Sequence, residues 1–204
     1  IPYGKPVLPR ELLDSGCPPL LAAVLALRGV HSRQEADALF FGGSETLYDP
    51  LGMKDMEKAV RRIRRAIETG ETVAVYGDYD VDGITSTCLM TDYLRSKGLT
   101  CLPYIPDRNE EGYGLNNAAI DSLHDRGVRL LITVDCGITA IAEAAHAAAV
   151  GMDLIITDHH ECGHGELPDA AAVIDCKQSG DTYPNKNLAG VGVALKLACA
   201  CEGD

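Results

Sequence analysis

The sequence predicts an α/β protein with a mostly parallel five-stranded sheet, helices on both faces of the sheet, and an N-terminal helical segment. From Glu71 onward, short apolar runs rich in β-branched residues alternate with longer helical patterns. Glycines such as Gly98 and Gly127 follow these helical patterns, where helices commonly end. An alternation of strand and helix is typical of parallel sheets covered on both faces.

The first 70 residues are predicted to be helical and to pack on the core as a segment of their own, residues 1–70. An apolar helix at 20–27 is followed by Gly29, and Ser32 with Glu35 forms a capping-box pattern for a second helix. A third, longer helix carries apolar residues at spacings of three and four, which predicts a buried stripe: Met53, Met56, Val60, Ile63 and Ile67.

Residues 71–204 are predicted to form the α/β domain. The expected strands are 72–76, 99–105, 129–134, 153–157 and 171–174. The expected helices are 84–97, 117–126, 139–150 and 190–201.

Composition narrows the class of protein. The 204 residues are 46% hydrophobic and 24% charged, as in a globular protein with a sizeable core. A net charge of −12 argues against a generally basic nucleic-acid-binding surface, although not against a local one. No apolar run approaches the roughly 20 residues of a membrane span, and eight cysteines without a CxxC pair indicate a reducing cytoplasm.

Acidic and imidazole side chains follow three of the predicted strands. The first strand leads into a turn with Asp78, Asp80 and Asp82, the third ends at Asp135, and the fourth ends at Asp158–His160. Ligands of open parallel sheets bind beyond the carboxyl ends of the strands, so these groups are expected to meet. An acidic surface turn is the alternative for the first group alone. Mixed oxygen and nitrogen donors favour Mn²⁺, with Mg²⁺ next.

The motifs DYDVDG, VDCG and DHH resemble those of the DHH phosphoesterase superfamily. Within it, the chain is most similar to the RecJ family of single-stranded-DNA-specific exonucleases. The segments YGDYDVDGITST, PDRNEEGYGLN, ITVDCGI, IITDHH and LAGVGVALKL carry this resemblance in order and spacing, which extends over about residues 20–197.

The resemblance implies a set of metal ligands. Asp80 and Asp82 match the ligands of the first motif, Asp135 matches the carboxylate that bridges two cations, and His159 matches the imidazole ligand. The implied reaction is hydrolysis of a phosphodiester, assisted by two Mn²⁺ or Mg²⁺ ions. The implied substrate is single-stranded DNA, degraded from the 5′ end during repair and recombination.

Three further residues are assigned to catalysis by the same resemblance. His160 matches the histidine that lines the site as a ligand or a phosphate contact. Asp78 and Asp158 are expected to orient the ligands.

Four residues are predicted to contact the substrate. Gly190 and Gly192 precede a helix whose N–H groups suit a phosphate, with close helix–strand packing as the alternative. Arg108 and Tyr113 lie in the loop after the second strand, where Tyr113 either stacks on a base or anchors the loop.

The family also has a further aspartate ligand and C-terminal domains beyond the end of this chain. The expectation is therefore a fragment with weak metal affinity and little or no exonuclease activity, in a protein whose remaining regions meet repair or replication proteins. Asp175 is interpreted as a loop aspartate rather than a replacement ligand. The alternatives are another DHH phosphoesterase (an oligoribonuclease, a cyclic-dinucleotide phosphodiesterase or a pyrophosphatase) and a non-enzymatic interaction module.

Overall fold

The computed structural model describes residues 7–42, 47–108, 110–112, 114–163 and 165–203. Contacts divide the chain into two compact units, Ile1–Leu47 and Tyr48–Asp204. The first unit contains the helices α1 (Arg10–Asp14), α2 (Pro19–Leu27) and α3 (Arg33–Phe41). The predicted capping box is present at the start of α3. A small core joins the three helices: Leu12, Ala22, Leu25 and Ala36.

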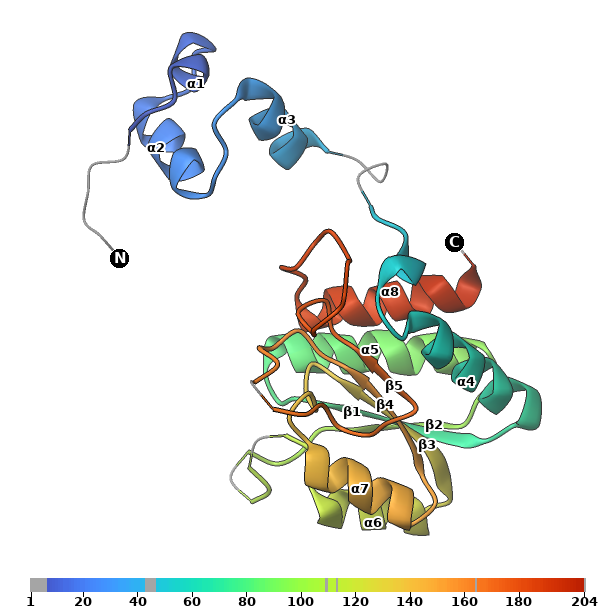
Figure 1. Cartoon of the computed structure of the whole chain (residues 1–204). Coiled ribbons are helices and arrows are strands. Elements are labelled where there is room, and N and C mark those ends of the chain that lie inside the picture. The colour runs from blue at the N-terminus through green and yellow to red at the C-terminus, as the bar shows by residue number, and fades with distance from the viewer. Residues whose placement is uncertain (1–6, 43–46, 109, 113, 164, 204) are drawn as a thin grey trace. The chain divides into compact units, whose positions relative to one another are not determined.

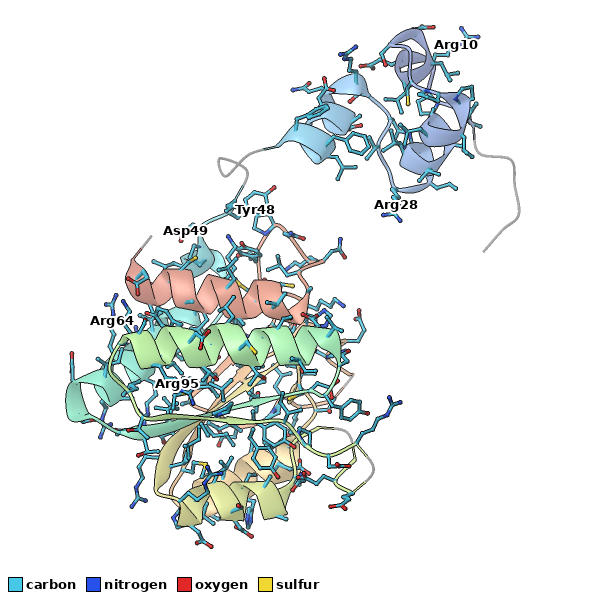
Figure 2. The ribbon with its side chains drawn as sticks, turned by 180° about the vertical axis from the view of Figure 1, so that it is seen from behind. Arg10, Arg28, Tyr48, Asp49, Arg64 and Arg95 are labelled. Carbon is cyan, nitrogen blue, oxygen red and sulfur yellow. The ribbon has the colours of Figure 1, made fainter. Side chains whose placement is uncertain are left out.

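The second unit begins with a 3₁₀ turn, η2 (Pro50–Gly52), and the helix α4 (Met56–Thr69). Most of the predicted apolar stripe is buried in the core of this unit, and Ile67 packs at its edge. Arg64 lies on the exposed side of α4 (Figure 2). The helix that the sequence analysis placed in the N-terminal segment is therefore part of the α/β unit. The predicted packing of the first unit on this core stays a prediction.

Five strands form one parallel sheet in the order β2-β1-β3-β4-β5 (Figure 1). This confirms the predicted α/β class and the number of strands. The strands are β1 (Thr72–Gly77), β2 (Cys101–Tyr104), β3 (Val128–Val134), β4 (Asp153–Thr157) and β5 (Ala172–Ile174).

Helices cover both faces of the sheet, as predicted. One layer contains α4, α5 (Val81–Ser96) and α8 (Gly190–Glu202), and the other contains α6 (Asn117–Asp125) and α7 (Ile141–Ala149) (Figure 1). Alternate residues of β1 enter the two cores: Val73 and Val75 face the first layer, and Ala74 and Tyr76 face the second. Among the described residues, no helix has the length and apolar character needed to cross a membrane.

The strand order reverses at β1 and β3, since β1 leads outward to β2 while β3 lies on its other side. The helix after β1, α5, packs on one face of the sheet, and the helix after β3, α7, packs on the other. The two connections therefore diverge at the carboxyl ends of β1 and β3, one toward each face of the sheet. Such a switch point is where open α/β sheets form a crevice for ligands.

Candidate metal centre

The side chains at the three strand ends meet in one cluster. His159, after β4, places its Nε2 atom 3.0 Å from Oδ1 of Asp135, which follows β3. The same nitrogen lies 3.6 Å from Oδ2 of Asp82, in the first turn of α5. Residues that are far apart in the sequence thus lie close together at the carboxyl edge of the sheet, as their positions predicted.

The turn between β1 and α5 is built around glycine. A Cβ atom on Gly83 would lie 2.3 Å from the carbonyl oxygen of Asp78, and one on Gly77 would lie 2.0 Å from Oγ1 of Thr87. Asp80 caps the helix, because its Oδ1 accepts a hydrogen bond of 3.0 Å from the N–H of Gly83. The cap explains why α5 begins at Val81, three residues before the predicted start.

Asp82 is held by hydrogen bonds from α8, which lies in the same helical layer as α5. Its Oδ2 accepts a hydrogen bond of 2.7 Å from the N–H of Gly190, and its Oδ1 accepts one of 2.8 Å from the N–H of Val191. These are the first two residues of α8. The sequence analysis predicted that the N–H of Gly190 contacts a phosphate of the substrate. In the structure this N–H donates a hydrogen bond to a carboxylate of the protein instead. Gly192 contacts the side chain of Leu188 and stays a predicted substrate contact.

Asp135 is the most buried of the carboxylates predicted to bind metal, with 2% of its surface exposed. Its backbone has a φ of 61°, a left-handed conformation that aspartate tolerates better than most residues. Oδ1 has no hydrogen-bond partner among the described residues, although Nε2 of His159 is 3.0 Å away, so this contact lacks hydrogen-bond geometry. Burial, followed by the charges of Asp82 and Asp80, raises the pKa of Asp135 to about 7.

Two sets of donor atoms have the proximity that a metal ion requires. Ligand atoms of Asp135, His159 and His160 lie within 4.8 Å of one another, and those of Asp78, Asp80 and Asp135 form a second such set. Asp135 belongs to both sets. A buried carboxylate oxygen without a hydrogen bond, surrounded by other carboxylates, is stabilised when a cation binds it. The donor set therefore fits divalent metal of the Mn²⁺ or Mg²⁺ type.

The sequence analysis assigned one of these donors differently. Asp78 is an orienting residue in that assignment, whereas the structure places its carboxylate among the donors of the second set. Burial raises the pKa of Asp78 above its ordinary value. The two sets leave out Asp82, whose oxygens are engaged by the amides of α8.

Asp158 is buried, and its side chain links the segment after β4 to the segment after β3. Its Oδ1 accepts a hydrogen bond of 2.7 Å from the N–H of His159 and lies 2.7 Å from Nδ1 of His160, while its Oδ2 accepts one of 2.9 Å from the N–H of Ile138. With a proton on Nδ1, the imidazole of His160 is fixed in one orientation by this contact. Burial opposes the charge on His160, but the hydrogen bond and the charge of Asp158 outweigh it and raise the pKa.

The loop after β2 places a cation at the same edge. The guanidinium carbon of Arg108 lies 5.2 Å from the ring centroid of Tyr79, a residue that the sequence analysis did not select. The loop is tied to the sheet, because the hydroxyl of Tyr76 donates to the carbonyl of Gly114 at 2.7 Å and Tyr104 donates to Glu111 at 2.6 Å. The predicted contact Tyr113 lies outside the described residues.

A cavity of about 370 Å³ opens beside the histidines. Its lining includes Asp158 and His160, the turn at 137–140, and Glu143 of α7. The cavity therefore lies on the α7 side of the candidate donors, next to the face on which His160 is exposed.

Asp175 lies in a loop, as the sequence analysis interpreted it, but this loop position is buried. It follows β5 and is fully buried. Oδ1 accepts a hydrogen bond of 2.7 Å from the N–H of Lys177, and Oδ2 has no hydrogen-bond partner among the described residues. Burial raises the pKa of Asp175 to about 6, and the charge of Asp158 adds to this effect.

The comparisons with known proteins agree with this geometry. Residues 72–204 match the DHH family, N-terminal domain. The chain is 48% identical over 186 residues to the single-stranded-DNA-specific exonuclease RecJ of Bacillus subtilis, and 41% identical over 194 residues to the RecJ of Escherichia coli. These matches cover 91% and 95% of this chain, but only 24% and 32% of the relatives.

Solved structures give the same result. A crystal structure of exonuclease RecJ bound to manganese matches with a TM-score of 0.69 and 33% identity, over 77% of this chain and 40% of that one. The RecJ of Thermus thermophilus in complex with Mn²⁺ matches with a TM-score of 0.70 and 27% identity, over 96% of this chain and 27% of that one.

Proposed function

This chain belongs to the DHH family, and on that premise we propose that it is the metal-binding part of an exonuclease that degrades single-stranded DNA from the 5′ end. The similarity to exonucleases of that printed specificity supports the substrate class. The observation that carries the proposal is Asp135, a buried carboxylate that belongs to two sets of metal donors and has one oxygen without a hydrogen-bond partner among the described residues.

The proposed ligands are Asp80, Asp82, Asp135 and His159, and the proximity of their donor atoms supports Asp78 and His160 as further candidates. Two bound cations would supply the positive charge that activates a water molecule and stabilises the leaving oxygen of a phosphodiester. Asp135, common to both donor sets, would hold the two ions close together.

The remaining residues hold and orient the reacting groups. Asp158 fixes the ring of His160, which is partly exposed beside the cavity and is therefore placed to meet a phosphate of the substrate. Arg108 is exposed at the same edge, where its charge can attract the DNA backbone. The chain binds a polyanion at this edge only with cations present, because its own groups there are mostly carboxylates.

A chimera tests this function directly. The matching 186 residues of the Bacillus subtilis relative are replaced by this chain, and hydrolysis of a 5′-labelled single-stranded oligonucleotide is followed with Mn²⁺ and with EDTA. We expect Mn²⁺-dependent release of nucleotides, and its loss in the same chimera carrying Asp135→Ala. Activity that survives EDTA or the substitution would contradict the proposal.

The same assay separates the alternative substrates. A cyclic dinucleotide, a short oligoribonucleotide and pyrophosphate are offered in competition with the single-stranded DNA. Preferential hydrolysis of any one of them would assign the chain to a different activity within the family. Binding without any hydrolysis would favour an interaction module instead.

A further inference from the structure

The first turn of α8 contacts both carboxylates at the centre of the cluster. Asp82, which lies 108 residues earlier, receives hydrogen bonds of 2.7 and 2.8 Å from the N–H groups of Gly190 and Val191. Each oxygen of Asp82 has one of these donors. The carboxylate is therefore held in one plane and one rotation, with its remaining lone pairs available to another partner.

Gly190 also lies against Asp135. A Cβ atom at position 190 would approach Oδ1 of Asp135 to 2.4 Å, a distance that real Cβ atoms do not adopt. That oxygen is the one without a hydrogen-bond partner among the described residues. The absence of a side chain at Gly190 thus allows a buried carboxylate to occupy its position, and any larger residue would displace it.

Gly192 differs from its neighbour although it lies in the same helical turn. Its Cβ atom would lie 3.4 Å from Cδ2 of Leu188, the end of a flexible side chain that can move away. A methyl group at 192 is therefore tolerated, whereas one at 190 meets Asp135. Replacement by alanine raises helix propensity by the same amount at both positions. Gly190→Ala and Gly192→Ala therefore form a matched pair of variants.

The helix that carries these groups is firmly anchored. Val193 and Leu197 of α8 are fully buried in one core with Met90 and Leu94 of α5. Its own N-cap residue, Ala189, provides no side-chain hydrogen bond. The carboxylate of Asp82 satisfies these N–H groups from another element of the fold.

We propose that the first turn of α8, through the N–H groups of Gly190 and Val191 and the missing side chain of Gly190, positions Asp82 and Asp135 for cation binding. This inference rests on the proposed function, because it assumes that these carboxylates bind metal. It assigns Gly190 to ligand positioning, in place of the phosphate contact expected from the sequence. A helix cap that served stability alone would make the same two hydrogen bonds, so the test separates metal affinity from folding.

The experiment measures Mn²⁺ binding to the 204-residue chain by calorimetry, after each variant has been shown to fold by circular dichroism. Gly190→Ala displaces Asp135, and Val191→Pro removes one donor to Asp82 while proline remains compatible with the first turn of a helix. Loss of groups that orient metal ligands typically weakens metal binding about 10- to 100-fold, and we expect this range for both variants. Gly192→Ala serves as a control for Mn²⁺ binding alone, because its predicted contact is with substrate and its added Cβ meets no candidate ligand; it should bind Mn²⁺ within about twofold of the wild type.

Unfolding in EDTA supplies the second measurement. Gly190→Ala should lower the unfolding midpoint of the wild type but have a smaller effect in an Asp135→Gly background, which lacks the Cβ and carboxylate atoms that the added methyl group meets. An equal loss in both backgrounds would contradict the contact. If Gly190→Ala does not fold, Val191→Pro decides the metal measurement.

The outcomes distinguish the two proposals. If the wild type binds Mn²⁺ and both folded variants bind it equally well, the positioning role is wrong while the proposed function stands. If the wild type does not bind Mn²⁺, the proposed metal centre fails and the positioning role fails with it.

Discussion

Replacement of the buried Asp175 by asparagine should stabilise the chain at neutral and alkaline pH. The carboxylate is fully buried, and one of its oxygens has no hydrogen-bond partner among the described residues. Burial raises its pKa from the ordinary 3.8 to about 6. This difference corresponds to about 3 kcal/mol of unfavourable free energy for the ionised form in the folded chain.

The direction of the pH dependence follows from linkage. The folded chain binds the proton of Asp175 more tightly than the unfolded chain does, so stability is lost as pH rises from about 4 through about 6. Above about pH 7 the full penalty is present, and at about pH 4 less than about 1 kcal/mol of it remains. An asparagine side chain at this position would still accept the N–H of Lys177, but its buried amide needs an acceptor, which reduces the net gain to about 1–2 kcal/mol.

Urea unfolding in EDTA at about pH 8 and about pH 4 measures this effect. We expect Asp175→Asn to exceed the wild type by about 1–2 kcal/mol at the higher pH and to fall below it by about 0.5–1.5 kcal/mol at the lower pH, where the wild type has lost most of its charge penalty but the amide of the variant still lacks an acceptor. Asp169→Asn, which alters an exposed carboxylate shortly before β5, is the control and should change little at either pH. A destabilised Asp175→Asn at the higher pH would show that the charge of Asp175 is compensated in the folded state, and would refute the reasoning.

Three further predictions concern the site. Asp158→Asn, which disturbs the orientation of the ring of His160, should reduce Mn²⁺-dependent hydrolysis by the chimera about 10- to 100-fold; unchanged turnover would contradict the orienting role. Gly83→Ala forces a Cβ atom against the backbone of the β1–α5 turn and should cost about 2–4 kcal/mol in urea unfolding, whereas Gly163→Ala, with open space around it, should cost less than about 0.5 kcal/mol. Arg108→Ala should weaken single-stranded DNA binding and reduce the slope of log affinity against log salt by about 0.7; an unchanged slope would exclude a phosphate contact.

The strands of the sheet and the acidic side chains at its carboxyl edge were predictable because local sequence patterns determine them. The β-branched run at 72–76 predicts a buried strand, and the acidic residues after three strands are predicted to meet, since the ends of parallel strands share one edge. The stripe on α4 predicts a buried face. It does not reveal which element the helix packs against, and its contacts place it in the unit Tyr48–Asp204.

Contacts between distant segments were not predictable in the same way. The sequence GVG indicates a helix start near a phosphate or a strand, but it carries no signal that the amides of Gly190 and Val191 face Asp82. Asp175 follows a strand of only three residues and precedes polar loop residues, a pattern typical of an exposed turn. Its burial results from the tertiary packing around the end of the sheet.

Anomalous diffraction from crystals of the chain soaked in Mn²⁺ tests the central claim most directly. The account predicts two manganese peaks that share Asp135, one beside His159 and His160 and the other beside Asp78 and Asp80. Peaks confined to other parts of the surface, or none near Asp135 at saturating Mn²⁺, would contradict it.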